Sequence, residues 1–233
     1  MTTPDVVLAR PSKRKKKQTR PYQPPPSERK LPVVGIAIGA VALVLAVGLA
    51  VALAGSGGDD AVEDDRPAFG PVTVTGTSLP TFAATDGDAA AGAETPTVEG
   101  VDPDGGAVSV GGAASGEPTL VAFLAHWCPH CQAELPVLVD LEADGAFEGV
   151  RTVAVLTGTD DNAPNFPPAA WLDEEGWTGD VLLDDEAATA AQAFGLQGYP
   201  FLVVLDGEGR VVARTSGELP AEEVEALVDA ARA

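Results

Sequence analysis

Two cysteines three positions apart are the residues of this 233-residue chain whose type and spacing could do chemistry. They follow an apolar run of strand length, 119–125, in the sequence His126-Trp127-Cys128-Pro129-His130-Cys131. A Cys-x-x-Cys pair at a strand-to-helix junction is typical of a redox-active dithiol. Unpaired amides and the positive end of the helix dipole would stabilise a thiolate at Cys128. Because Cys131 lies one helical turn further on, we expect a reversible disulfide with Cys128 as its exposed partner.

The residues around the pair have alternative interpretations. Pro129 suits the first turn of a helix. A protonated His130 would stabilise the Cys128 thiolate and make the disulfide more oxidising, whereas a neutral, exposed His130 would not. We expect His126 at the surface, on the rim of the site, rather than as a catalytic acid or a ligand. Trp127 is expected to be a packing platform beside the disulfide, with substrate contact as its second role.

Strand-like and helix-like patterns alternate over residues 96–233 and place the pair in an α/β domain. The expected strands are 97–101, 107–110, 119–125, 151–157, 181–183, 201–205 and 210–214. The expected helices are 129–143, 167–176, 185–194 and 220–233. The turn sequence at 206–209 predicts a hairpin near the C-terminus. This order favours a mixed central sheet with helices on both faces and an N-terminal β-hairpin extension.

With these features the domain resembles the thioredoxin superfamily, and specifically its membrane-anchored TlpA/ResA-like thiol–disulfide oxidoreductases. The resemblance covers about residues 96–233. It is carried by the run 123–131, by Glu134 and Pro136 in the following helix, and by Gly198-Tyr199-Pro200 before a strand. It implies a thioredoxin-like fold in which Pro200 is cis and lies against the cysteines. It also implies that the substrates are proteins with thiols or disulfides.

The resemblance assigns further roles by position. It implies that Glu134 accepts the proton of Cys131, with an ordinary solvated helix glutamate as the alternative. Tyr199 and Pro200 would contact the substrate, although Tyr199 could simply fill space. Ala122 stands where thioredoxins proper have a buried Asp. The Pro-His dipeptide between the cysteines resembles DsbA-type oxidases, while the rest resembles TlpA-type reductases, so we favour a reductase and leave an oxidase open.

The expected reaction is thiol–disulfide exchange through a mixed disulfide. No flavin or nicotinamide motif is present, so we expect no cofactor and an external redox partner embedded in the membrane. The competing interpretation is a copper-binding or metallochaperone module that uses Cys128, Cys131 and the nearby histidines. A c-type haem attachment site is excluded because Gln132 stands where it needs a histidine.

The charges form three blocks that describe a membrane topology. Residues 1–32 carry a net charge of +7, residues 33–54 are uncharged and apolar, and residues 55–233 carry −28. The apolar block predicts one transmembrane helix, with the basic tail 1–32 in the cytoplasm and the rest extracytoplasmic. A cleaved signal peptide is the alternative. Residues 55–95 predict a flexible acidic, Gly/Ala-rich linker, and 96–233 the domain. The sequence pI of about 4.2 argues against a nucleic-acid partner.

Overall fold

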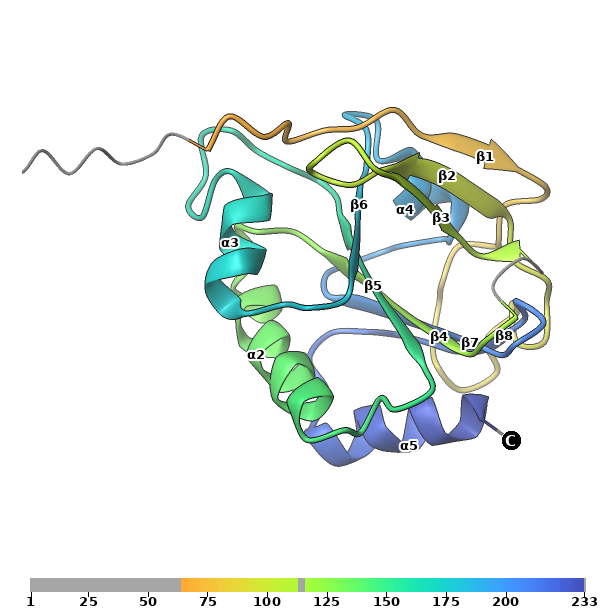
Figure 1. Cartoon of the computed structure of the whole chain (residues 1–233). Helices are drawn as coiled ribbons and strands as arrows, with labels where there is room; N and C mark the ends of the chain where they lie inside the picture. Colours follow the sequence, from red (N-terminus) through yellow and green to blue (C-terminus); the bar gives the residue numbers. More distant parts are fainter. Residues whose placement is uncertain (1–63, 113–115, 233) are drawn as a thin grey trace, which may run out of the picture. The chain divides into compact units, whose positions relative to one another are not determined.

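The computed structural model describes residues 64–112 and 116–232 (Figure 1). The expected cytoplasmic tail 1–32 and transmembrane helix 33–54 lie outside these residues. Within the described ranges, no helix has both the length and the apolar character needed to cross a membrane. The elements are β1 Thr73–Thr75, β2 Thr97–Val101, β3 Ala107–Val110, β4 Thr119–Leu124, α2 Pro129–Ala143, β5 Arg151–Leu156, α3 Pro168–Glu175, β6 Asp180–Leu183, α4 Thr189–Ala193, β7 Phe201–Leu205, β8 Val211–Ser216 and α5 Ala221–Ala231.

The central sheet has the strand order β6-β5-β4-β7-β8. β4, β5 and β6 run parallel to one another, whereas β7 and β8 are antiparallel to their neighbours. All six residues of β4 are buried, as its continuous apolar sequence predicts for a central strand. The carboxyl ends of the three parallel strands meet at one edge of the sheet, so residues that follow β4, β5 and β6 are brought together there.

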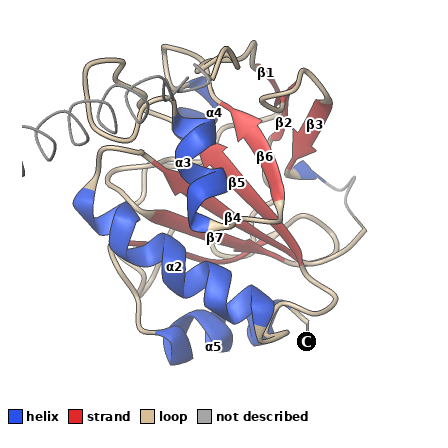
Figure 2. Ribbon diagram, turned by 60° about the vertical axis from the view of Figure 1, so that its left-hand side comes forward, coloured by secondary structure: helices blue, strands red, loops and turns tan. Residues whose placement is uncertain are grey.

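Both faces of this sheet are covered, which confirms the expected mixed sheet with helices on each side. Alternate residues of β4 point to opposite faces. Leu120, Ala122 and Leu124 join the core cluster that also contains buried residues of α2, α3 and α5. Val121 and Phe123 join a second cluster with residues of α4, β2 and β3. Figure 2 shows α2 and α3 lying across the first of these faces.

One helix is shorter than predicted. The sequence favours a helix over 185–194, but α4 begins only at Thr189. Ala188 adopts a left-handed conformation with φ 56°, and Asp185 accepts hydrogen bonds from the backbone N–H and the hydroxyl of Thr189. The neighbouring Asp184 carboxylate accepts from the backbone N–H groups of Ala190 and Ala191. The two acids therefore cap the helix from a preceding turn instead of forming its first turn.

The linker expected over 55–95 does not extend over residues 73–95. β1 pairs with β2, so the predicted hairpin is the core of a three-stranded sheet, β1-β2-β3. Leu79 and Phe82 are buried in the cluster beneath that sheet. The prediction was wrong here because this stretch has few large apolar side chains, yet those few are enough to fix it to the domain.

A buried ion pair joins this stretch to β8. The fully buried guanidinium of Arg214 donates to both carboxylate oxygens of Asp88, at 2.8 and 2.5 Å. It also donates to the carbonyl oxygens of Pro80 and Phe194, each at 2.8 Å. The Arg214 guanidinium holds the pKa of the Asp88 carboxyl below its usual range. The guanidinium thus makes four hydrogen bonds, all within the domain.

Replacing Asp88 with asparagine should destabilise the domain by roughly 3–5 kcal/mol, because it leaves a buried guanidinium without its counter-charge. Since the pKa of Asp88 is lowered in the folded state, its contribution to the free energy of unfolding is complete above a pH of about 4 and is lost as the pH falls further. The difference in unfolding free energy between wild type and Asp88→Asn should therefore become smaller in acid. Urea unfolding at several pH values measures this. Asp86→Asn, an exposed acid in the same loop, should change little; equal effects of both variants would contradict the prediction.

Candidate active site

Cys128 lies where the chain turns from β4 into α2. It occupies the N-cap position of α2 with extended backbone angles, φ −77° and ψ 119°, and Pro129 begins the helix. Its backbone N–H donates to the carbonyl oxygen of Ala125 at 2.9 Å, which closes the turn. The Cys128 side chain points toward the loop before β7, with Sγ 4.0 Å from the carbonyl oxygen of Tyr199. The predicted position of Cys128 at the start of a helix is therefore the observed one.

Cys131 lies deeper than Cys128. Both cysteines are buried free thiols, with relative exposures of 0% for Cys131 and 7% for Cys128. Cys128 is therefore the more accessible of the two but not the exposed residue that the sequence predicts. The backbone N–H of Ala125 donates to Cys131 Sγ at 3.5 Å. Burial raises the pKa of the Cys131 thiol strongly, and the nearby Cys128 and Glu134 raise it further, against the opposing effect of the Ala125 hydrogen bond. The inner thiol therefore holds its proton until a base removes it.

Glu134 is a buried glutamate rather than a solvated one, because its relative exposure is 1%. Its Oε2 accepts a hydrogen bond from the backbone N–H of Leu219 at 2.9 Å. Its Oε1 is buried and has no hydrogen-bond partner among the described residues. Burial raises the pKa of the Glu134 carboxyl, while the Leu219 amide opposes this. The free oxygen and the raised pKa are properties that a proton acceptor for Cys131 needs.

His130 is exposed and contacts Glu218, a neighbour that the sequence did not reveal. Its Nδ1 contacts the Oε1 of Glu218, and the His130 side chain is 68% exposed. Glu218 directly precedes Leu219, whose amide holds Glu134. The connection between β8 and α5 therefore contacts both the residue between the cysteines and the buried carboxylate behind them. No local pattern marks Glu218, which lies 88 positions from His130.

The loop before β7 brings Tyr199 and Pro200 to the cysteines. The Tyr199–Pro200 peptide bond is cis, as the resemblance implied. The Tyr199 ring packs edge-on against Trp127, with 6.0 Å between ring centroids, and burial raises the pKa of the Tyr199 hydroxyl. The Trp127 indole N–H donates to the carbonyl oxygen of Gly158 at 2.7 Å. Trp127 is thus both fixed by packing and 37% exposed.

His126 is not on the surface, which corrects the expectation of an exposed residue on the rim. Its relative exposure is 1%. Nδ1 donates to the carbonyl oxygen of Pro164 at 2.7 Å, and Nε2 accepts from the backbone N–H of Asp160 at 3.2 Å. These partners define a neutral imidazole with its proton on Nδ1. A metal ion could not use either nitrogen without breaking one of these bonds, which removes His126 from the ligands of the copper-binding alternative.

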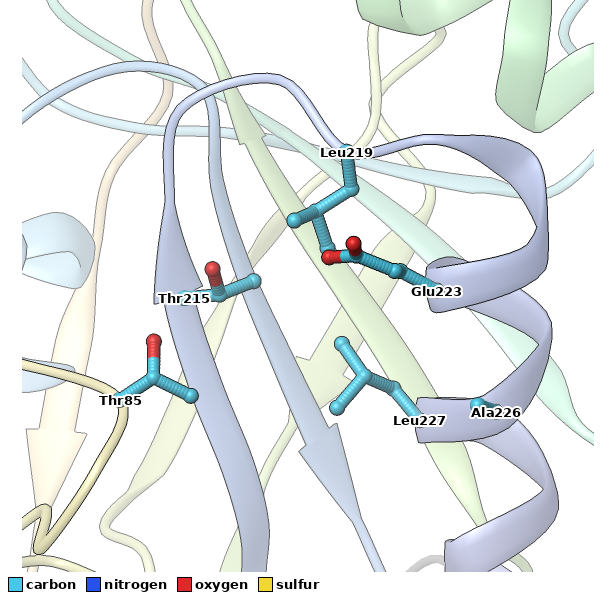
Figure 3. A pocket seen from close by; sticks show the side chains of 6 residues that line it. All are labelled: Thr85, Thr215, Leu219, Glu223, Ala226 and Leu227. Carbon is cyan, nitrogen blue, oxygen red and sulfur yellow. The ribbon is translucent and has the colours of Figure 1, made fainter.

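The described residues contain no group of three His, Cys, Asp or Glu side chains arranged to hold a metal ion. A hollow of about 350 Å³ lies between β8 and α5 (Figure 3). Leu219 lines it, but neither cysteine does. Its other lining residues are Thr85, Thr215, Glu223, Ala226 and Leu227. The candidate active site is therefore the surface around Cys128 and not this hollow.

The mixed sheet, the Cys-x-x-Cys pair at the start of α2 and the cis-proline loop together define a protein of the thioredoxin fold. The chain belongs to the Redoxin family, whose sequence profile matches residues 76–230. This confirms the resemblance to the thioredoxin superfamily.

Curated relatives and solved structures agree with this assignment. The thiol:disulfide interchange protein DsbE of Haemophilus influenzae is 34% identical over 105 residues, which are 45% of this chain and 53% of the relative. A TxlA homolog of Synechocystis is 29% identical over 116 residues, half of each chain. A crystal structure of a candidate DsbE from Chlorobium tepidum has a TM-score of 0.52 and 22% identity, and covers 61% of this chain and 98% of that one. The chain spans about half the length of these DsbE and TxlA relatives.

Proposed function

We propose that the protein is a thiol–disulfide oxidoreductase that exchanges disulfides with protein substrates through Cys128 and Cys131. The observation that carries this proposal is the asymmetry of the pair. Cys128 lies at a helix start and faces the cis-proline loop, whereas Cys131 is buried behind it beside a buried carboxylate. An outer thiol suits attack on a substrate, and an inner thiol suits the release of that substrate.

In the reducing direction, the Cys128 thiolate attacks one sulfur of a substrate disulfide. A Cys128–substrate disulfide forms, and the other substrate sulfur leaves as a thiolate that takes up a proton. Cys131 then loses its proton to Glu134, and its sulfur attacks Cys128 Sγ. This step forms the Cys128–Cys131 disulfide and releases the second substrate thiolate, so the substrate gains two electrons that the dithiol loses.

We assign Glu134 as the base that takes the proton of Cys131 in the second step, the resolution of the mixed disulfide. Cys131 is buried and its pKa is raised, so it reacts slowly unless a neighbouring base takes its proton. Glu134 combines an unpartnered buried oxygen with a raised pKa, and its carboxylate is near enough to influence Cys131. Trp127, Tyr199 and Pro200 form the surroundings of Cys128 and are the residues we propose for contact with the substrate.

The reducing direction is favoured over the oxidising one by the features shared with TlpA-type reductases, Glu134 above all. The names of the DsbE relatives describe thiol:disulfide interchange and support the reaction without fixing its direction. A reducing cycle needs a dithiol partner that returns two electrons to the Cys128–Cys131 disulfide. We propose that this partner is membrane-embedded, because an extracytoplasmic reductase depends on electrons that cross the membrane.

We also propose that residues 33–54 anchor the protein as a single-pass membrane helix with the basic tail 1–32 in the cytoplasm. The support is the order of the charge blocks in the sequence. The catalytic domain would then be extracytoplasmic. The linker would end before Arg66, which already pairs with Asp173 of the domain.

The reduction potential of the Cys128/Cys131 pair tests both the function and its direction. The protein is equilibrated with glutathione buffers, and insulin reduction is followed in a parallel assay. A potential near that of thioredoxin, about −270 mV, with insulin reduction supports the reductase. A potential near that of DsbA, about −120 mV, would assign the oxidase instead. Binding of one copper(I) equivalent without disulfide exchange would contradict the proposal.

A further inference from the structure

The segment 158–167 between β5 and α3 is hydrogen-bonded to His126 and Trp127, the two residues that precede Cys128. The Trp127 side chain donates to the carbonyl oxygen of Gly158 at 2.7 Å. The ring nitrogens of His126 bond to the carbonyl oxygen of Pro164 and to the backbone N–H of Asp160. The side chain of Asn165 donates to the carbonyl oxygen of His126 at 3.1 Å. Four hydrogen bonds thus fix this segment to the start of the active site.

These hydrogen bonds set the position of Phe166. Asn165 takes up a left-handed conformation with φ 62°, which asparagine tolerates better than most residues, while its side chain bonds to His126. The Phe166 ring then lies edge-on to the buried His126 imidazole, with 6.1 Å between ring centroids. Yet Phe166 remains 43% exposed. The ring thus contacts the imidazole and still presents part of its surface to solvent.

Phe166 and Trp127 are the large hydrophobic side chains exposed in the described part of the chain. A single exposed apolar side chain needs no explanation. These two, however, both neighbour His126, Trp127 in sequence and Phe166 by ring contact. Trp127 directly precedes the nucleophile. One ring directly precedes Cys128 and the other contacts His126, two positions before Cys128. Two exposed aromatic rings at these positions form a surface suited to an apolar side chain.

The same segment also carries two exposed acidic side chains. Asp160 and Asp161 are exposed, and their carboxylates accept hydrogen bonds from Asn162. Neither takes part in an ion pair within the described ranges. An exposed pair of uncompensated carboxylates favours a basic partner.

We propose that Phe166, together with Trp127, selects extended substrate segments in which an apolar side chain lies next to the reacting cysteine, and that Asp160 and Asp161 favour a basic residue further along. Phe166 is a specificity-determining residue in this assignment, and His126 is the positioning residue that holds it. The inference rests on the proposed function, because it concerns the substrate of the same cysteines.

The test compares two peptide disulfides that differ only in the residue beside the cysteine, leucine or serine, each with a lysine two positions further on. Wild type should show a lower KM for the leucine peptide. Phe166→Ala should raise the KM for the leucine peptide about 10-fold and the KM for the serine peptide less than about 2-fold. Phe166→Leu should retain most of the preference. Leu227→Ala, a half-buried residue of α5 (Figure 3), should leave both values unchanged.

The outcomes separate the inference from the proposed function. Turnover of both peptides with equal KM values in wild type, or an equal loss for both in Phe166→Ala, would overturn the inference and leave the oxidoreductase intact. No turnover of either peptide would overturn the proposed function, and this inference with it. Replacing the peptide lysine with glutamate should raise the KM at low salt, and Asp161→Asn should reduce that effect; no effect of the glutamate would remove the proposed role of the two acids.

Discussion

Cys128→Ser should lower disulfide exchange more than about 10³-fold, whereas Cys131→Ser should let the reaction begin and then stop. A serine at position 128 is a weak nucleophile at neutral pH and cannot form a disulfide. With serine at position 131, Cys128 still attacks, because its place at the start of α2 is unchanged. The mixed disulfide then persists, since the buried group behind it can no longer displace the substrate.

Each cysteine variant is the control for the other. Incubation with an excess of a protein disulfide, followed by non-reducing electrophoresis and mass spectrometry, should show a covalent adduct for Cys131→Ser. The adduct should be absent from Cys128→Ser and should disappear with dithiothreitol. Adduct formation by Cys128→Ser instead would mean that Cys131 is the attacking residue, which would contradict the burial of its sulfur.

The features that the sequence predicts correctly are those whose cause is local. The apolar run of β4, the helix start at Pro129 and the hairpin turn at 206–209 depend on neighbouring residues only. The spacing of Cys128 and Cys131 fixes their relation to α2 in the same way. These local signals are enough to place the redox pair at the edge of a mixed sheet.

The features that the sequence does not predict depend on contacts between distant residues. His126 is a polar residue beside an active site, so an exposed position is the reasonable expectation. Its burial results from two backbone groups 34 and 38 positions away. Phe166 carries no motif, and its role is visible only because the segment before α3 folds back onto His126. Glu218 is likewise one of many acids until the structure places it against His130.

The connection between β8 and α5 links the outer and inner parts of the site. Glu218 pairs with the exposed His130, and the next residue, Leu219, donates its amide to the buried Glu134. A single turn of chain thus contacts the group between the cysteines and the group proposed to take the proton of Cys131. The orientation of the Glu134 carboxylate consequently depends on backbone that the His130–Glu218 contact also holds.

Glu134→Gln should slow turnover about 10²–10⁴-fold, the range typical of a lost general base. The amide oxygen of glutamine can still accept the Leu219 N–H, so the local structure is retained while the proton acceptor is removed. The first step uses only Cys128 and should proceed at its wild-type rate. The variant should therefore accumulate the mixed disulfide that wild type resolves quickly.

The rate at which the mixed disulfide is resolved should depend on pH in wild type but not through Glu134 in Glu134→Gln. Burial raises the pKa of Glu134, so the carboxylate form that accepts a proton becomes populated only above the ordinary glutamate range of about 4.3. Resolution of the mixed disulfide by wild type should accelerate as the pH rises through that raised pKa, and Glu134→Gln should lack this rise. Rapid-quench measurement of adduct decay across pH reports this acceleration directly.

Glu225→Gln, which replaces an exposed glutamate of α5, should behave as wild type. A wild-type decay rate that Glu134→Gln reproduces at every pH would show that Cys131 loses its proton to another group, because a buried thiol with a strongly raised pKa cannot react quickly unaided.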